Sequence, residues 1–265
     1  RIAERYARRC GHGCRRADIP PPSDSPALPS APPPHPLKPM STPAFRRMLA
    51  ASAWANALPP PEFDRVVAET VVRTCPAGGV VCRKGETVDH WIGVVEGLVK
   101  MANVSVDGKP MSFTGIGTGG WFGEGSLLKD EPRRYDIVAL RESQIAYMPR
   151  GTFARLLDTN FAFNRFLIVQ LNERLGQFIA MVEHDRLRGP EARLARSLAG
   201  LFNPVLYPGI GSSLPVSQEE LGQLVGLSRQ RVNQALKRLE AEGLLRVEYG
   251  SVSVLDLARL RTYGE

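Results

Sequence analysis

Apolar positions between residues 217 and 242 repeat at the spacing of an α-helix, in two runs that meet at Gly226. The stripe of the first run is Leu221, Leu224 and Val225, and that of the second is Val232, Ala235, Leu236 and Leu239. Ser217 and Ser228 stand where the two helices begin, and Glu220 completes a capping box with Ser217. The pattern predicts two short capped helices joined by a glycine turn.

The outward face of the second helix is polar and basic. Residues 228–239 include four basic side chains and no acidic one, so this helix carries a local positive field that suits phosphates. Arginine and glutamine can also address base edges in the major groove, while we expect Ser228 and Lys237 to lie near phosphates. The candidate DNA-contacting residues are Ser217, Ser228, Arg229, Gln230, Arg231, Asn233, Gln234 and Lys237.

Two β-prone runs follow Gly243, at residues 244–248 and 251–255, and Tyr249-Gly250 between them is a hairpin signal. Two helices followed by a hairpin predict a winged helix. The alternative is a surface helix with a solvated basic face, which describes most charged helices. Because caps, turn, basic face and hairpin occur together here, the pattern favours double-stranded DNA as the partner.

Before residue 217, the spacing of the apolar residues changes twice along the chain. Residues 43–74 are helical in pattern and break at Pro59-Pro60-Pro61, whereas residues 75–148 hold short β-prone runs between glycine turns, typical of a β-roll or barrel. A long helix follows, with an apolar heptad seam that predicts a parallel helix pair across a homodimer. The alternative is one amphipathic helix lying on its own roll. The seam residues are Ile168, Leu171, Leu175, Phe178 and Val182.

Composition restricts the possible folds and partners less tightly than these patterns do. The 265 residues are 43% hydrophobic, which suffices for packed cores, and the net charge of +7 fits a nucleic-acid partner. Residues 1–42 are proline-rich and predicted to be a disordered leader; Cys10, His12 and Cys14 supply only three metal ligands there, so we expect no metal site. No apolar stretch is long enough for a membrane span and no secretory core follows the basic start, so we expect a cytoplasmic protein. The scattered histidines form no catalytic pattern, and we expect no enzyme.

Several motifs resemble the Crp/Fnr family of bacterial transcription regulators. They are Arg83-Lys84-Gly85-Glu86, Val95-Glu96-Gly97-Leu98-Val99, Trp121-Phe122-Gly123-Glu124, the long helix after Arg150, and residues 217–242. The resemblance implies an α+β chain with an N-terminal, jelly-roll-like β-roll that binds an effector, at residues 43–158. It implies a dimerisation helix and hinge at residues 159–188, and a winged helix-turn-helix DNA-binding domain at residues 189–265.

The segment from Gly119 to Leu128 is the candidate effector loop. Its glycines let backbone N–H groups approach an anion, and Glu124 can accept a hydrogen bond from a ribose hydroxyl. The resemblance places Arg134 as the phosphate-pairing arginine. Alternatively, the glycines only make tight turns and Arg134 pairs with a surface acid. The candidate effector-binding residues are Gly123, Glu124, Gly125, Ser126, Arg133, Arg134, Tyr135, Asp136 and Phe178.

Four positions depart from the family's cyclic-AMP-binding pattern. Tyr135 and Asp136 stand where that pattern has small or hydroxyl residues, and Phe178 and Ile179 replace the hydroxyl side chains that meet adenine. Those two cannot hydrogen-bond a base through their side chains, although Phe178 can stack on a purine. Read as an Arg-x-x-Asp set, Arg133 to Asp136 also resembles motifs that bind cyclic di-GMP.

The sequence therefore predicts a homodimeric DNA-binding transcription regulator whose effector is cyclic AMP, cyclic GMP or cyclic di-GMP, with RNA polymerase as a partner if it activates. Two alternatives remain. One is a DNA-binding regulator without an effector, and the other is a nucleotide-binding module that controls a partner protein without touching DNA.

Overall fold

A computed structural model describes residues 43–104, 110–185 and 189–264 of the chain. The leader predicted at residues 1–42, with its Cys10-to-Cys14 segment, lies outside the described residues, and so do residues 186–188 of the predicted hinge. The first described elements are α2 (Pro43–Ala51), the 3-10 turn η1 (Ala55–Ala57) and α3 (Pro60–Glu69). The helical break predicted at the proline run is confirmed, because α3 begins on Pro60, where a missing N–H costs nothing.

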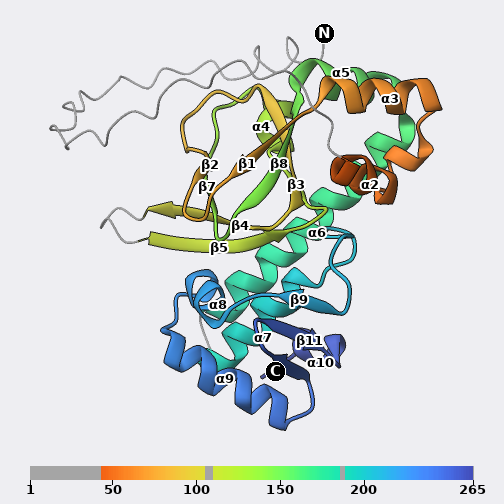
Figure 1. Cartoon of the computed structure of the whole chain (residues 1–265). Helices are drawn as coiled ribbons and strands as arrows, with labels where there is room; N and C mark the ends of the chain where they lie inside the picture. The colour runs from red at the N-terminus through yellow and green to blue at the C-terminus, as the bar shows by residue number, and fades with distance from the viewer. Residues whose placement is uncertain (1–42, 105–109, 186–188, 265) are drawn as a thin grey trace, which may run out of the picture. The chain divides into compact units, whose positions relative to one another are not determined.

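Eight strands form two four-stranded antiparallel sheets that enclose a common core, the β-roll (Figure 1). The sheet orders are β1-β8-β3-β6 and β2-β7-β4-β5. Inward-facing side chains of both sheets, among them Ile92, Ile116 and Ile137, make one buried cluster, as alternating strand residues should. The strands are β1 (Val71–Cys75), β2 (Val80–Cys82), β3 (His90–Glu96), β4 (Leu98–Val104), β5 (Pro110–Gly117), β6 (Trp121–Phe122), β7 (Asp136–Ala139) and β8 (Ser143–Pro149).

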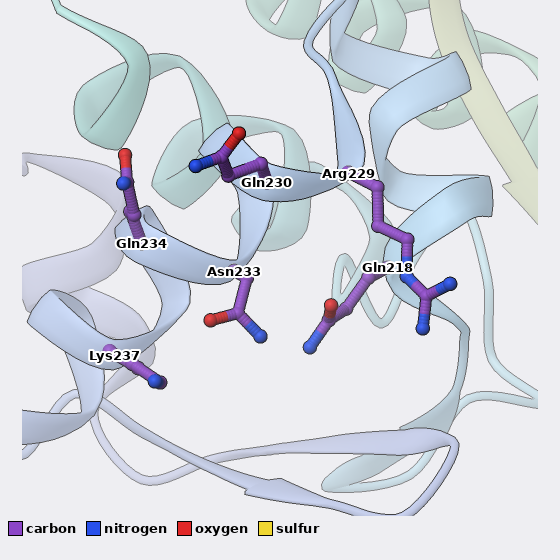
Figure 2. Close-up of a pocket in the computed structure, with 6 residues that line it drawn as sticks. All are labelled: Gln218, Arg229, Gln230, Asn233, Gln234 and Lys237. Carbon is purple, nitrogen blue, oxygen red and sulfur yellow. The ribbon is translucent and has the colours of Figure 1, made fainter.

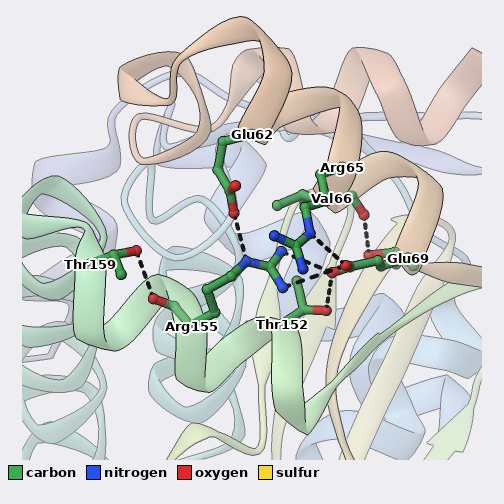
Figure 3. Close-up of polar contacts among 8 residues, drawn as sticks. Glu62, Arg65, Val66, Glu69, Thr152, Arg155 and Thr159 are labelled. Carbon is green, nitrogen blue, oxygen red and sulfur yellow. Dashed lines mark hydrogen bonds and ion pairs between the residues drawn. The ribbon is translucent and has the colours of Figure 1, made fainter.

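Helices α4 (Glu124–Lys129), α5 (Arg150–Thr159) and α6 (Phe161–Asp185) accompany the roll. A second buried cluster joins α2, α5 and the start of α6 to strand β3 through aromatic rings such as Trp54, Trp91 and Phe163. Polar contacts tie α3 to α5, since Arg155 pairs with Glu62 at 2.9 Å and with Glu69 at 2.8 Å (Figure 3). The N-terminal helices are therefore built into the roll.

The C-terminal part of the chain, called the reader below, runs from α7 to α10 (Figure 1). Its core is a third cluster, in which apolar residues of α7, α8 and α9 pack against the strands of the reader and against Leu98 of the roll. The predicted hairpin is confirmed as β10 and β11, with Gly250 in the left-handed region at φ 71°. Strand β9 was not predicted. The elements are α7 (Pro190–Leu201), β9 (Ser213–Pro215), α8 (Gln218–Val225), α9 (Arg229–Ala241), β10 (Leu245–Glu248), β11 (Ser251–Val254) and α10 (Leu257–Arg261).

Candidate DNA-binding and effector sites

Helix α8 starts with the capping box that the sequence predicts. The Ser217 Oγ accepts the Glu220 N–H at 3.2 Å, and the Glu220 carboxylate accepts the Ser217 N–H at 2.7 Å. Gly226 ends the helix in the left-handed conformation at φ 66°, which glycine adopts without strain. Ser228 then caps α9 by accepting the Arg231 N–H at 3.4 Å. These local contacts fix the start of both helices and the turn between them.

Helix α9 buries its apolar stripe and turns its polar side outward. Its buried residues are Val232, Ala235, Leu236 and Leu239, as predicted. The outward side forms a shallow hollow with the start of α8, where Gln218 and Arg229 approach one another and Asn233 and Lys237 follow along α9 (Figure 2). The residues that line the hollow are Gln218, Arg229, Gln230, Asn233, Gln234 and Lys237.

The structure adds one residue to this surface and leaves another outside the hollow. Gln218, the first residue of α8, lines the hollow but was not a candidate from the sequence, although its place directly after the cap pointed to it. Arg231 is exposed but does not line the hollow. Within the described ranges, no acidic side chain pairs with Arg229, Arg231 or Lys237. By contrast, Arg238 lies 3.6 Å from Glu191 and 3.9 Å from Glu242.

The effector loop contains a buried carboxylate that already has partners. Glu124 follows Gly123, whose φ of 94° is left-handed, and its Oε1 lies 3.4 Å from the Arg174 Nε of α6. The Trp91 indole donates to its other oxygen at 3.4 Å, and Arg174 Nη2 donates to the Trp121 carbonyl. Sequence reasoning missed Arg174. Helix α6 holds two arginines, Arg165 and Arg174, and their spacing along the helix gave no sign that only Arg174 is buried.

Arg174 is held charged inside the protein. Burial alone lowers its pKa, but the Glu124 carboxylate and then the Tyr207 and Tyr135 phenols outweigh that effect and raise it. Its Nε and Nη1 have no hydrogen-bond partner of good geometry among the described residues. A buried guanidinium with spare donors is chemically suited to an additional anion.

The two neighbouring arginines have opposite surroundings. Arg133 is only 7% exposed and its Nη2 donates to the His90 carbonyl at 3.2 Å. A Cβ added to Gly123 would lie 2.9 Å from Arg133 Nη1, so the arginine reaches into the turn that precedes Glu124. Arg134, in contrast, has a side chain that is 67% exposed and pairs with Glu131. The structure therefore brings Arg133 into the effector loop and leaves Arg134 on the surface.

The other effector candidates are spread around this loop. Tyr135 packs against the roll core, where burial and then the Glu124 charge raise its pKa. The Asp136 carboxylate accepts the Lys84 N–H at 2.7 Å. Gly125 faces open space, and the Ser126 hydroxyl donates to the Pro132 carbonyl at 3.4 Å.

Helix α6 exposes a stripe of large apolar side chains. Of the predicted seam, Phe178 packs against the roll core, while the neighbouring Ile179 is exposed. The other four seam residues are exposed too, so the stripe continues through Ile179 at that turn. Besides Phe161 at its start, the exposed large apolar residues of α6 are Ile168, Val169, Leu171, Leu175, Ile179 and Val182.

Comparison with known proteins gives the same order of parts. Residues 72–160 match the family profile of the cyclic nucleotide-binding domain, and residues 192–263 match that of the Crp-like helix-turn-helix domain. The chain is 28% identical to the cyclic AMP receptor protein of Thermus thermophilus, over 80% of this chain and 96% of that protein. It is 27% identical to the cAMP-activated global transcriptional regulator CRP of Haemophilus influenzae, over 75% of this chain and 90% of that protein.

Among solved structures, the c-di-GMP responsive global regulator CLP of Xanthomonas campestris is 25% identical, with a TM-score of 0.52 and coverage of 74% of this chain and 99% of that one. The two profiles match this chain in the order of roll and then reader, and its alignments cover 90% and 96% of the two regulators. The chain therefore belongs to the Crp/Fnr family of transcription regulators.

Proposed function

We propose that this protein is a sequence-specific, homodimeric regulator of transcription that binds double-stranded DNA through α9. The observation that carries the proposal is the basic outward face of α9, on which Arg229, Arg231 and Lys237 have no acidic partner among the described residues. Arginine can pair with guanine, and asparagine or glutamine with adenine, through two hydrogen bonds each. Arg229, Gln230, Asn233 and Gln234 are placed to read bases, with Gln218 beside them.

Phosphate contacts position the reader on the duplex. The serine caps Ser217 and Ser228 stand at the positive ends of two helices, while Arg231 and Lys237 flank the base-reading residues. These contacts are largely independent of sequence and weaken with salt, because binding releases counterions.

The apolar stripe of α6 supports the homodimer. Its exposed side chains are too large and too many for a solvated helix face, and a second copy of α6 would cover them in a parallel pair. Two readers related by a two-fold axis then meet half-sites about one helical turn of DNA apart.

The effector is an anion held by Arg133, Arg174 and the backbone at Gly123. The spare donors of the buried Arg174 support this assignment, and relatives named for cyclic AMP and for c-di-GMP indicate the class of ligand. A cyclic mononucleotide fits better than cyclic di-GMP, because Asp136 is already engaged by the Lys84 N–H and is less available for a guanine edge. Glu124 can exchange its present partners for a ribose hydroxyl.

We place the protein in the cytoplasm, where an activator would meet RNA polymerase, and assign it no catalytic role. Across the described ranges, none of the helices combines the length and apolar character that crossing a bilayer needs.

DNA binding is tested by selecting genomic fragments with the purified full chain and titrating the enriched sequences in gel shifts. We expect discrete fragments that share a two-fold symmetric site, and a loss of affinity with Arg229→Ala but little with Arg238→Ala. Failure to enrich any fragment at low salt, with or without nucleotide, would favour a regulatory module that acts without DNA.

The effector is tested by calorimetry with cyclic AMP, cyclic GMP and cyclic di-GMP. Arg133→Ala and Arg134→Ala form a matched pair, since each removes one guanidinium from adjacent positions. We expect Arg133→Ala to abolish binding and Arg134→Ala to preserve it. The reverse result would assign the anion to the surface arginine, and heat from none of the three ligands would indicate a regulator without such an effector.

A further inference from the structure

The segment that connects α7 to β9 packs into the β-roll. Leu206 and Tyr207 are buried in the cluster between the two sheets, and Ile210 packs against both that cluster and the core of the reader. Asn203 shapes the segment, because its Oδ1 accepts the N–H groups of Val205 at 2.9 Å and of Leu206 at 3.1 Å. We call residues 206–210 the wedge loop.

Gly117, which ends β5, and Gly120, which precedes β6, form the seat of the wedge loop. A Cβ built at Gly117 would lie 2.3 Å from Ile210 Cδ1, and one at Gly120 would lie 2.8 Å from Tyr207 Cδ1. Neither glycine has a left-handed φ, so backbone conformation does not require them. At Gly117 both atoms within 4 Å of the added Cβ belong to Ile210, whereas at Gly120 the Cβ would also lie 2.7 Å from Ile116 Cγ2 of the roll. Close approach of the wedge loop therefore accounts for the missing side chain at Gly117.

The seat adjoins the effector loop. The Tyr207 hydroxyl donates to the Gly115 carbonyl at 2.9 Å, and Gly120 directly precedes Trp121, whose carbonyl accepts from Arg174. Arg174 also pairs with Glu124, and the Tyr207 phenol is among the groups that act on its charge. One guanidinium therefore contacts the effector loop at Glu124 and, at Trp121, the residue next to the seat.

A second tie holds the reader to the roll. Arg141, in the turn between β7 and β8, donates to both carboxylate oxygens of Glu220 at 2.7 and 2.8 Å. Nearby, the Ser112 hydroxyl donates to the Gln223 carbonyl at 2.8 Å. Because Glu220 also closes the capping box of α8, the roll is bonded to the start of the DNA-binding helices.

We propose that the wedge loop is a brake on DNA binding: seated in the roll, it keeps the reader in a resting orientation, and an anion that recruits Arg174 loosens the seat. This inference rests on the proposed DNA-binding function and names its regulation. A ligand shifts such an equilibrium only if it binds the two arrangements unequally, and the shared Arg174 supplies that difference. By linkage, loosening the wedge loop strengthens the binding of both anion and DNA.

The test enlarges a glycine of the roll so that the wedge loop can no longer pack against it. Gly117→Val places a branched side chain against Ile210, the residue that supplies every atom found within 4 Å of the new Cβ. Adding Ile210→Ala makes room again and should reseat the loop. Gly151→Ala is the matched control, because a Cβ there meets nothing within 4 Å.

Hydrogen exchange reports the seating of the loop in the full-length chain. The Tyr207 and Ile210 N–H groups are bonded within the segment, to Asn203 and Tyr207 carbonyls. We expect slow exchange in the wild type, faster exchange in Gly117→Val and recovery in the double variant. Fast exchange in the wild type, or no change in Gly117→Val, would overturn the proposed seat.

DNA titration without nucleotide then tests the brake. We expect Gly117→Val to bind its DNA site about tenfold more tightly than the wild type. Cyclic AMP or cyclic di-GMP should then raise the DNA affinity of the variant by a smaller factor than that of the wild type. Faster exchange with unchanged DNA affinity would overturn the brake and leave the DNA-binding function intact. If neither the wild type nor any variant binds a duplex, the proposed function itself fails.

Discussion

The reader and the effector loop both concentrate charge, but they hold it in opposite ways. On α9, Arg229 and Lys237 are exposed and lack acidic partners among the described residues. In the roll, Glu124 and Arg174 are buried and face one another at 3.4 Å. The basic side chains of α9 can therefore meet a polyanion without giving up existing partners, whereas a ligand in the roll would have to exchange existing contacts for new ones.

This contrast has an energetic consequence. Exposed charges are screened by salt and contribute little to folding, so the basic face of α9 serves binding rather than stability. A buried pair is costly to form and still more costly to break, because the remaining charge stays inside without a partner. Substitutions in the two regions should accordingly separate stability from DNA affinity.

The largest effect should come from breaking the buried pair. Arg174→Ala leaves the Glu124 carboxylate uncompensated and removes the donor to the Trp121 carbonyl. We expect a loss of about 3–5 kcal/mol in the free energy of unfolding, measured by urea titration with far-UV circular dichroism.

Arg134→Ala is the control for this prediction, since that side chain is 67% exposed. It should change the free energy of unfolding by less than about 0.5 kcal/mol. Equal losses from both variants would show that the charge of Arg174 is solvated in solution, and the contrast between the two regions would disappear.

The reader should show the opposite behaviour. Arg229→Ala should weaken binding to the selected DNA site by about 1–3 kcal/mol if it contacts a base, while the urea midpoint stays unchanged. Arg238→Ala removes the same charge from the same helix, but Arg238 is occupied by Glu191 and Glu242 and should matter less. A larger affinity loss from Arg238→Ala would contradict the assigned face.

A smaller effect is expected where the reader does depend on a polar group for stability. Ser228→Ala removes the acceptor for the Arg231 N–H at the start of α9. We expect a destabilisation of about 1 kcal/mol in the reader's unfolding transition, and Ser228→Asp should restore it. Loss of DNA affinity without any loss of stability would instead make Ser228 a phosphate contact alone.

The smallest effect concerns pH and a third kind of site, the cluster between α3 and α5 (Figure 3). Partial burial alone raises the pKa of Glu69, but hydrogen bonds from Thr152, Arg155 and Arg65 outweigh it and lower the pKa to about 2. Because the folded pKa is depressed, the stabilisation is complete above the ordinary pKa of 4.5 and fades as pH falls toward 2.

Glu69→Gln should remove this component of acid sensitivity. Urea midpoints measured between pH 6 and pH 3 should fall less steeply in the variant than in the wild type, in line with its smaller proton uptake on unfolding. Parallel curves would show that Glu69 titrates normally in the folded protein.

Local signals made the reader predictable. The serine caps, the Glu220 box and the turn at Gly226 are all confirmed, because each depends on residues within a few positions of one another. Strand β9 was not predicted because Ser213–Pro215 is too short to show an alternation of apolar and polar residues. It is a strand because it pairs with β11. The winged helix was therefore correct in type and incomplete by one strand.

The effector loop depends on contacts that sequence spacing does not encode. The family resemblance pointed to Arg134 for phosphate pairing, but the structure buries Arg133 and leaves Arg134 exposed. Arg174 lies fifty residues from Glu124, so their pairing was not visible along the chain. Which side chains bind an effector stays a prediction.

The aromatic cluster of the roll limits what optical experiments can report. All three tryptophans of the chain, Trp54, Trp91 and Trp121, pack together, with the rings of the last two stacked 4.3 Å apart. Intrinsic fluorescence will therefore follow this corner beside Glu124 and remain silent about α9. Emission and circular dichroism traces that fail to coincide would reveal a reader that melts on its own.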